Sequence, residues 1–156
     1  MLNLHVVLAV DRAGLVGEDG ETHHGIFDVG FLRHAPGLTL LAPSSCAEQQ
    51  QMLQWAVEDH HGVVAIRYPR GGDRCCVDSS WDLQTVVSDG ILACHREGDD
   101  ILLVTYGTLL QNVLDASQML SECGIEATVC RFVSLNPLPV SQLTAYMHDN
   151  SKVIEL

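Results

Sequence analysis

The sequence predicts an α/β fold made of two lobes, each a parallel sheet covered by helices. Short apolar runs of strand length alternate with helical segments along the chain, which is typical of parallel strands joined by crossover helices. A polar stretch with neighbouring glycines and serines interrupts this alternation near the middle, and the alternation then resumes. We therefore expect one lobe over residues 1–71, a linker over residues 72–88 and a second lobe over residues 89–156.

The first lobe shows a strand–loop–helix–strand–helix–strand pattern. We expect strands at residues 4–10, 38–42 and 63–68, and helices within residues 25–34 and at residues 46–59. The continuous apolar run at residues 4–10 predicts a strand buried on both faces. Ser44 or Ser45 marks the start of the long helix, because a serine oxygen accepts hydrogen bonds from the free N–H groups of a first turn.

The second lobe repeats the alternation. We expect strands at residues 91–94, 101–105, 127–132 and 152–156, and helices at residues 108–123 and 140–148. A polar turn at residues 97–100 joins the first two strands, and Gly124 suits the C-cap of the first helix. The sequence starts and ends in strands of the buried type, which need covering helices. We therefore expect a longer parent protein to complete both sheets.

Charge and composition exclude several classes of function. The formal net charge is −12 with only eight Lys and Arg residues, which argues against binding of nucleic acid. A phosphorylated small ligand would have to be held by a few focused arginines. No apolar run approaches a membrane span, and no basic segment precedes an apolar one near residue 1, so we expect a cytoplasmic protein. The six cysteines lack zinc spacing, and we expect no metal and reduced thiols.

Residues 11–25 form the polar segment richest in chemistry. Arginine, acidic residues, two histidines and glycines follow the end of the first predicted strand, which is where open α/β sheets bind ligands. Neither a G-x-G-x-x-G fingerprint nor a G-x-S-x-G elbow is present, so dinucleotide binding and serine hydrolysis are disfavoured. The residues alone leave two readings open: an active-site loop, or an ordinary solvated loop.

Six motifs in order resemble one enzyme family. They are D-R-A-G-L-V-G at residues 11–17, D-G-E-T-H-H-G-I-F-D at 19–28, A-P-S at 42–44, R-Y-P-R-G at 67–71, Y-G-T at 106–108 and R-F-V-S-L-N-P-L at 131–138. The chain thereby resembles transketolase-type thiamine-diphosphate enzymes, and in particular the 1-deoxy-D-xylulose-5-phosphate synthase family. The resemblance identifies the latter part of the pyrimidine-binding domain followed by the first part of the C-terminal domain.

The resemblance implies a transferase that joins pyruvate to glyceraldehyde 3-phosphate with loss of carbon dioxide, supplying isoprenoid, thiamine and pyridoxal synthesis. It implies catalytic roles for His23, which would bond substrate oxygens or relay protons, and for Asp19, which would hold a substrate hydroxyl or orient its neighbours. Arg12 and Arg70 would bind the phosphate of the aldehyde. By spacing alone, either arginine equally suits a surface ion pair.

The resemblance also implies what the parent protein binds. Thiamine diphosphate and Mg²⁺ would be its cofactors, and the parent would be a homodimer with its active site at an interface. The family's diphosphate and metal site, and the glutamate that activates the cofactor, precede the segment corresponding to residue 1. We therefore expect no turnover and no tight cofactor binding by this chain alone. Two alternatives stay open: a non-catalytic module of the same fold, or a transketolase or 2-oxo acid dehydrogenase β-type subunit with a separate α-type partner.

Overall fold

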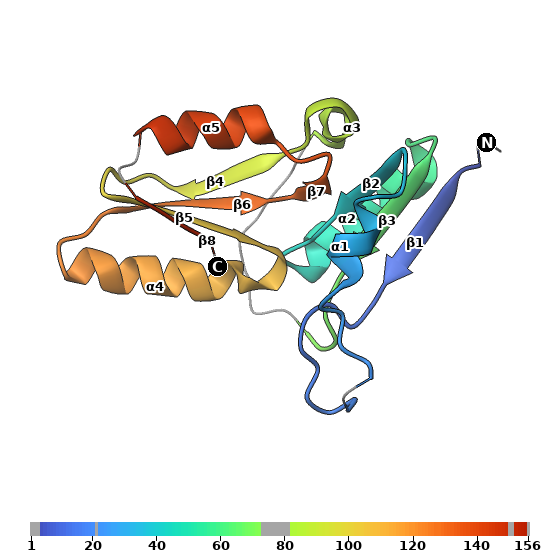
Figure 1. Ribbon diagram of the computed structural model, residues 1–156, viewed down its shortest axis with the longest axis horizontal. Coiled ribbons are helices and arrows are strands. Elements are labelled where there is room, and N and C mark those ends of the chain that lie inside the picture. The colour runs from blue at the N-terminus through green and yellow to red at the C-terminus, as the bar shows by residue number, and fades with distance from the viewer. Residues whose placement is uncertain (1–3, 21, 73–81, 150–151, 156) are drawn as a thin grey trace.

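Two four-stranded sheets lie side by side in the molecule, each flanked by helices (Figure 1). The computed structural model describes residues 4–20, 22–72, 82–149 and 152–155. The first sheet has the strand order β1-β3-β2-β7, and the second has the order β4-β6-β5-β8. The predicted α/β fold with two lobes is confirmed.

The elements follow the predicted alternation closely. In chain order they are β1 (Val6–Val10), α1 (Asp28–Leu32), β2 (Leu38–Leu41), α2 (Cys46–Glu58), β3 (Val63–Arg67), the 3-10 turn η1 (Leu83–Thr85), α3 (Val86–Asp89), β4 (Leu92–Arg96), β5 (Ile101–Tyr106), the 3-10 turn η2 (Gly107–Leu109), α4 (Leu110–Glu122), β6 (Ala127–Phe132), β7 (Ser134–Asn136), α5 (Val140–Asp149) and β8 (Val153–Glu155).

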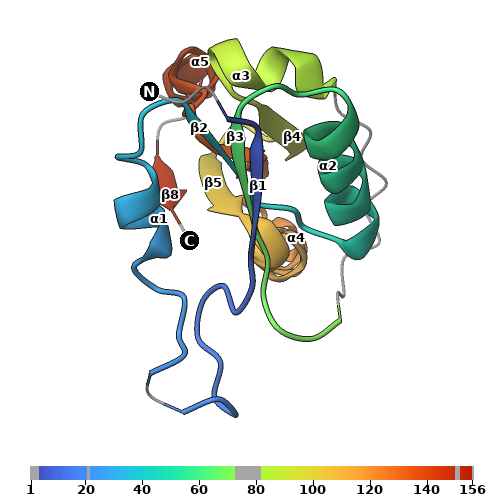
Figure 2. The same cartoon turned by 90° about the vertical axis from the view of Figure 1, so that its right-hand side faces the viewer.

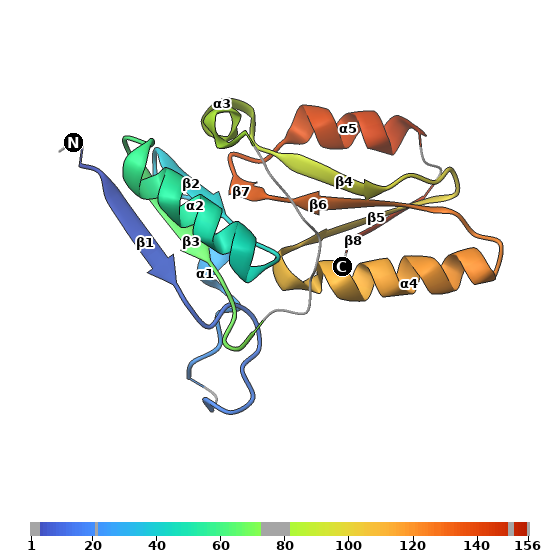
Figure 3. The same cartoon turned by 180° about the vertical axis from the view of Figure 1, so that it is seen from behind.

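Helices cover both faces of each sheet. In the first lobe, α1 and α2 lie on opposite sides of the strands (Figure 2), and α2 is seen in front of β3 from behind the molecule (Figure 3). In the second lobe, α4 and α5 lie on opposite sides of the sheet (Figure 1). The helix α2 begins as the sequence predicts, because the Ser45 hydroxyl accepts a hydrogen bond from the Glu48 N–H at 3.1 Å.

Both sheets are mixed, whereas the sequence predicts parallel sheets. The strand β7 runs antiparallel to β2, and β4 runs antiparallel to β6. The turn at residues 97–100 does not make a hairpin, because β6 lies between β4 and β5. The backbone of this turn bonds to residues around the start of β6 instead: the Gly98 N–H donates to the Thr128 hydroxyl at 3.0 Å, and the Asp100 N–H donates to the Glu126 carbonyl at 2.9 Å.

The strand β1 also departs from its prediction of burial on both faces. It is an edge strand with β3 as its partner, and Val6 and Leu8 are 36% and 38% exposed. An edge position leaves apolar side chains accessible even in an apolar run. The apolar composition therefore predicted the strand correctly but not its place in the sheet.

The two lobes share their apolar cores. One buried cluster joins β2 and β3 of the first sheet to β4, β5 and β6 of the second, through residues such as Leu40, Ala65 and Val104. A second cluster packs Met52 of α2 against residues of both lobes. The strand β7 completes the join, because it follows β6 of the second lobe directly but pairs with β2 of the first.

The described part of the predicted linker is partly helical. The elements η1 and α3 occupy residues 83–89, and Leu83 and Val86 are buried in the cluster around Met52. The stretch at residues 73–81, which includes Cys75, Cys76 and two serines, lies outside the described residues. Of the described cysteines, those at positions 94, 123 and 130 are free thiols, and Cys46 lies exposed at the start of α2.

A buried ion pair crosses between the lobes. The Arg131 guanidinium of β6 donates to Glu48 of α2 at 2.7 Å, and the two side chains are 0% and 1% exposed. Arg131 also donates to the Ala42 carbonyl at 3.3 Å, while the other Glu48 oxygen accepts from the Ser44 backbone N–H at 2.6 Å and from its hydroxyl at 2.9 Å. These additional bonds satisfy the charges that burial withdraws from water.

His95 lies beside this pair, with its Nε2 atom 3.4 Å from the Arg131 Nε atom. Burial, reinforced by the Arg131 charge and opposed by Glu48, lowers the pKa of His95 from 6.5 to about 4. The imidazole is therefore neutral in the folded protein at neutral pH.

Breaking the ion pair on one side is expected to destabilise the fold strongly. Glu48→Gln leaves the Arg131 charge buried without a counter-charge, which costs about 3–5 kcal/mol. The double variant Glu48→Gln/Arg131→Met should recover much of this loss, since neither charge remains. Urea denaturation measures the free energy of unfolding of both variants. The control is Glu126→Gln, which breaks a surface ion pair and should lose under about 1 kcal/mol of stability. Equal losses for the buried and the surface variant would contradict the role given to the pair.

The low pKa of His95 predicts a pH dependence of stability. An unfolded histidine takes up a proton below about 6.5, whereas the folded one does so only below about 4. The unfolded state therefore binds more protons in this window, and stability falls as the pH falls from about 6.5 to about 4. His95→Asn should lose less stability than the wild type across this window, measured as the urea midpoint at each pH. Parallel curves for the two proteins would refute the assignment.

Candidate functional site

The polar segment at residues 11–25 forms a loop that projects beyond the carboxyl ends of β1 and β3 (Figure 1). Its base is fixed by backbone hydrogen bonds. The Ala13 N–H donates to the Tyr68 carbonyl at 3.0 Å, which ties the loop to the segment after β3. The Gly25 N–H lies 3.0 Å from both the Arg12 and Gly14 carbonyls, and closes the loop on itself. The two loop stems are thus held side by side at the strand ends.

Gly25 is required at this closure. A Cβ atom at Gly25 would lie 2.5 Å from the Arg12 carbonyl oxygen, which is closer than backbone atoms allow. Arg12 itself has a φ of 58°, in the left-handed region that residues with side chains seldom adopt. Such conformations persist only where the surrounding structure enforces them, and they concentrate at functional sites.

A second buried ion pair supports the loop from beneath. Arg67, at the end of β3, donates to Asp28 of α1 at 2.6 Å and to the Gly25 carbonyl at 2.7 Å. Both charged side chains are 8% exposed. The Arg67 guanidinium also lies 5.5 Å from the centre of the Tyr106 ring of the second lobe. Arg67 therefore connects the loop base, α1 and β5.

Three of the four residues predicted from the sequence meet in this loop region. Asp19 accepts from the Arg12 Nε atom at 2.7 Å, and its other oxygen accepts from Arg70. Arg12 also pairs with Asp11 at 2.5 Å, and Arg70 lies 3.5 Å from Glu18. The Asp19 side chain is only 14% exposed, whereas Arg12 and Arg70 are 41% and 48% exposed. Two partly accessible guanidinium groups from separate loops thus share one shielded carboxylate.

This arrangement fixes the charge of the cluster. The hydrogen bond from Arg12 holds the pKa of Asp19 below its usual range, and the charges of Arg70 and His23 lower it further. The same bond to Asp19, with the Asp11 charge, raises the pKa of Arg12. Asp19 and Arg12 are therefore both ionised at neutral pH.

His23, the fourth predicted residue, lies on the same loop but outside the hydrogen-bonded cluster. Its side chain is exposed, and its Nδ1 atom lies 2.9 Å from the Thr22 hydroxyl. It is close enough to Asp19 for its charge to lower the pKa of that carboxyl. The neighbouring His24 points differently, because its Nδ1 atom accepts a hydrogen bond from the Val16 N–H at 2.8 Å. Of the two histidines, only His23 is exposed.

Two cavities adjoin the loop. One, of about 340 Å³, is lined by residues 11, 12 and 68–71 and by Gln49 of α2. The other, of about 460 Å³, lies between the loop and the second lobe and is lined by residues 13–15, Pro43, Arg67, Pro69 and 106–109. The first contains both arginines predicted to bind substrate. The second brings together four of the motifs that the sequence shows, although they are far apart along the chain.

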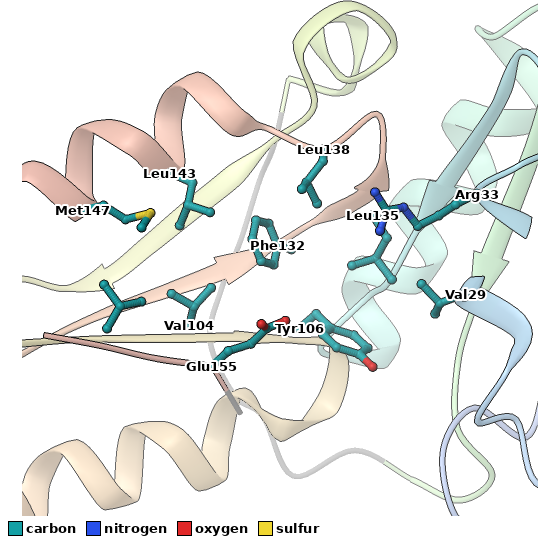
Figure 4. A pocket seen from close by; sticks show the side chains of 11 residues that line it. Val29, Arg33, Val104, Tyr106, Phe132, Leu135, Leu138, Leu143, Met147 and Glu155 are labelled. Atoms are coloured by element: carbon teal, nitrogen blue, oxygen red, sulfur yellow. The ribbon is translucent and has the colours of Figure 1, made fainter. Parts of the chain in front are cut away.

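A further cavity of about 420 Å³ is mostly apolar and lies between the lobes (Figure 4). Its lining comes from α1, β5, β6, β7, α5, β8 and flanking residues: Val29, Arg33, Val104, Tyr106, Phe132, Leu135, Leu138, Leu143, Met147, Val153 and Glu155. Sequence reasoning missed it, because most of its lining residues are ordinary apolar positions that only the packing of both lobes brings together.

The described residues contain no group of three or more His, Cys, Asp or Glu side chains that could hold a metal ion. Nor does the described part of the chain include a helix long and apolar enough to cross a membrane.

Comparisons with known proteins agree with this architecture. Residues 2–72 match the family described as transketolase, pyrimidine binding domain, and residues 90–155 match the transketolase C-terminal domain. The chain belongs to the transketolase family. Within it, the chain is similar to 1-deoxy-D-xylulose-5-phosphate synthases. The Desulforudis audaxviator synthase is 43% identical over 98% of this chain and 24% of its own length, and a Geobacter sulfurreducens synthase is 45% identical over 87% and 21%.

Solved structures show the same fold. The inactive β4 tetramer of a split-gene transketolase aligns with a TM-score of 0.83 and 26% identity, over 98% of this chain and 48% of that one. Transketolase from Campylobacter jejuni aligns with a TM-score of 0.72 and 20% identity, over 96% of this chain and 23% of its own. The chain spans about a quarter of the length of the curated synthases that it matches.

Removal of the Arg67 guanidinium is expected to loosen the loop base. Arg67→Met leaves Asp28 buried and unpaired and frees the Gly25 carbonyl, so the loss in stability is about 3–5 kcal/mol. Amide hydrogen exchange should accelerate at Ala13, Gly14 and Gly25, whose N–H groups close the loop. The control is Arg33→Met, which removes an exposed arginine next to α1. Unchanged exchange at the loop base in Arg67→Met would show that the loop holds its shape without this contact.

Proposed function

We propose that this chain is the part of a 1-deoxy-D-xylulose-5-phosphate synthase that binds the phosphorylated aldehyde and faces the reacting carbons. The observation that carries the proposal is the convergence of Arg12 and Arg70 on Asp19, beside the cavity of about 340 Å³. The similarity to synthases along nearly the whole chain supports it. The parent reaction would join pyruvate to glyceraldehyde 3-phosphate and release carbon dioxide.

The two arginines suit a phosphate group. A guanidinium offers several N–H donors in a planar fork, which match two phosphate oxygens at once. Arg12 and Arg70 keep donors free of Asp19, and their partial exposure leaves them accessible from the cavity. Since each comes from a different strand end, they would bind the phosphate from two directions. The cluster would therefore fix the phosphate end of the aldehyde.

His23 and Asp19 would act on the substrate oxygens. An imidazole has nitrogen atoms that can donate or accept a proton, so His23 would donate a proton to a developing alkoxide or remove one from a hydroxyl. Asp19 stays ionised and holds both arginines, and it would orient them and accept a hydrogen bond from a substrate hydroxyl. These assignments follow the family resemblance, and the shared loop position of the residues supports them.

The described residues do not by themselves fit the cofactors of the parent enzyme. Thiamine diphosphate supplies the carbanion chemistry of this enzyme class, and its diphosphate needs a metal ion as counter-charge. The described residues gather no metal-binding group, and the chain spans 24% of the relative's length. We therefore propose that other parts of the parent protein hold thiamine diphosphate and Mg²⁺, and that this chain alone is inactive.

Assembly and location complete the proposal. We propose a cytoplasmic homodimeric parent enzyme whose partners are small phosphorylated substrates. The similarity to a split-gene transketolase favours one alternative: a separate chain that needs a second subunit for activity, since that solved β4 assembly is inactive. Co-purification of this chain with an α-type partner would distinguish the two arrangements.

Kinetics of the complete parent protein test the roles of the four residues. Arg12→Met and Arg70→Met should each raise the KM for glyceraldehyde 3-phosphate about 10- to 100-fold, the loss of about 1.5–3 kcal/mol for a charged hydrogen bond, with a smaller effect on the KM for pyruvate. His23→Gln should lower kcat by about 10²- to 10⁴-fold.

Two controls accompany these variants. Arg96→Met removes an arginine of the second lobe that lies outside the loop, and should leave both KM values unchanged. The 156-residue chain without its parent should show no turnover. Full activity of Arg12→Met/Arg70→Met with an unchanged KM for the aldehyde would rule out the phosphate site.

A further inference from the structure

Cys94 and Cys130 face each other across two antiparallel strands. They are direct partners in the register of β4 and β6. Antiparallel pairs alternate between hydrogen-bonded and non-hydrogen-bonded types. The Val133 N–H donates to the Ile91 carbonyl at 3.0 Å, whereas the Leu92 N–H donates to the Gln142 side chain and not to β6. Leu92 thus belongs to a non-hydrogen-bonded pair. Because the two types alternate, Cys94, two residues further along β4, belongs to the next non-hydrogen-bonded pair.

This type of pair brings the two side chains closest together. Its Cα atoms are typically about 4.5 Å apart, which is inside the range of about 4.4–6.8 Å that a disulfide requires. Directly opposed residues also place their Cβ atoms on the same face of the sheet. The Cys94 thiol is near enough to Cys130 to raise the pKa of the Cys130 thiol. No rearrangement of the strands is needed to join them.

The two thiols differ in their access to solvent. Cys130 is fully buried, whereas Cys94 is half-buried and its thiol donates to the Arg96 carbonyl at 3.3 Å. Tyr146 of α5 packs against the same cluster and hydrogen-bonds with Cys94. Burial, together with the neighbouring Cys94, raises the pKa of the Cys130 thiol to about 12. A small reagent can therefore reach Cys94 but not Cys130.

We propose that Cys94 and Cys130 are a redox modification site, at which a small-molecule disulfide oxidises the pair to a reversible cross-strand disulfide. The Cys94 thiolate attacks one sulfur of the reagent, a mixed disulfide forms and one small thiolate leaves. Cys130 then loses its proton to the departing thiolate and attacks the Cys94 sulfur, and the second small thiol leaves. The protein loses two hydrogens, and the reagent is reduced to two thiols. The buried position of Cys130 slows its ionisation, and its proximity to Cys94 offsets this cost.

The site is separate from the polar loop and does not depend on the proposed function. Its effect is local. The new bond fixes β4 to β6 and removes the thiol that donates a hydrogen bond to the Arg96 carbonyl. It lies next to the point between Cys94 and Arg96 at which the pairing of β4 with β6 shifts register. The other described cysteines offer no such pair, because Cys46 begins α2 and Cys123 follows α4, and both are exposed.

Oxidised glutathione tests the proposal on the chain itself. To exclude other pairings, the four remaining cysteines are replaced by serine (C46S/C75S/C76S/C123S). After incubation, the intact mass should fall by two hydrogens, and peptide mapping should find residues 94 and 130 linked. A reducing thiol should reverse the change. Addition of one glutathione at Cys94 that persists without ring closure would overturn the proposal, as would an unmodified chain.

Two further variants separate the steps. In the same background, Cys130→Ala should accumulate the mixed disulfide at Cys94, because nothing resolves it. Cys94→Ser removes the accessible thiol, and Cys130 should then stay unmodified in the folded protein. Circular dichroism confirms that each variant is folded. Oxidation of Cys130 in the Cys94→Ser variant at the wild-type rate would show that Cys94 is not the entry point.

Discussion

The buried ion pair between Glu48 and Arg131 is the contact on which the joined architecture depends. Two charges fully withdrawn from water are tolerated only when each is met by an opposite charge and further hydrogen bonds. Glu48 accepts these bonds from Ser44 and Arg131, and Arg131 donates to Glu48 and to the Ala42 carbonyl. These hydrogen bonds can all form only when α2 and β6 lie in one relative position. The pair therefore specifies how the lobes meet, whereas the apolar clusters on either side supply most of the driving force through burial.

The same logic applies at the loop, where a second buried pair sets the geometry. Arg67 extends β3 into the space between the lobes, and its contacts with Asp28, Gly25 and Tyr106 come from three separate elements. Through its contact with Tyr106, Arg67 thus links the loop base to the second lobe. Arg12, Asp19 and Arg70 lie further out, where side chains remain partly exposed. Rigid contacts beneath and accessible charges above are what a binding loop on a sheet edge requires.

Local patterns were predictable from the sequence, and long-range placements were not. The helix over Cys46–Glu58 follows from serine capping and the predicted strands from apolar runs, because both depend on neighbours in the chain. The family resemblance, not a local pattern, predicted that Arg12 and Arg70 act together, and the structure brings both of them to Asp19. The pairing of β7 with β2 and the exposure of β1 had no local signal. Arg131 did provide a local signal, because an arginine inside an apolar strand requires a buried partner. Only the fold shows that this partner is Glu48.

An acidic protein that binds a phosphorylated ligand must concentrate its few positive charges. The net charge of −12 offers no long-range attraction for an anion, so recognition has to come from contact geometry. In the proposed phosphate site, Asp19 would provide it by holding the guanidinium groups of Arg12 and Arg70 in place before the ligand arrives. Side chains that are already ordered lose less conformational entropy on binding than free ones. The carboxylate weakens the local positive potential, but it converts two mobile surface arginines into one preformed site. The acidity of the loop is thus compatible with phosphate recognition.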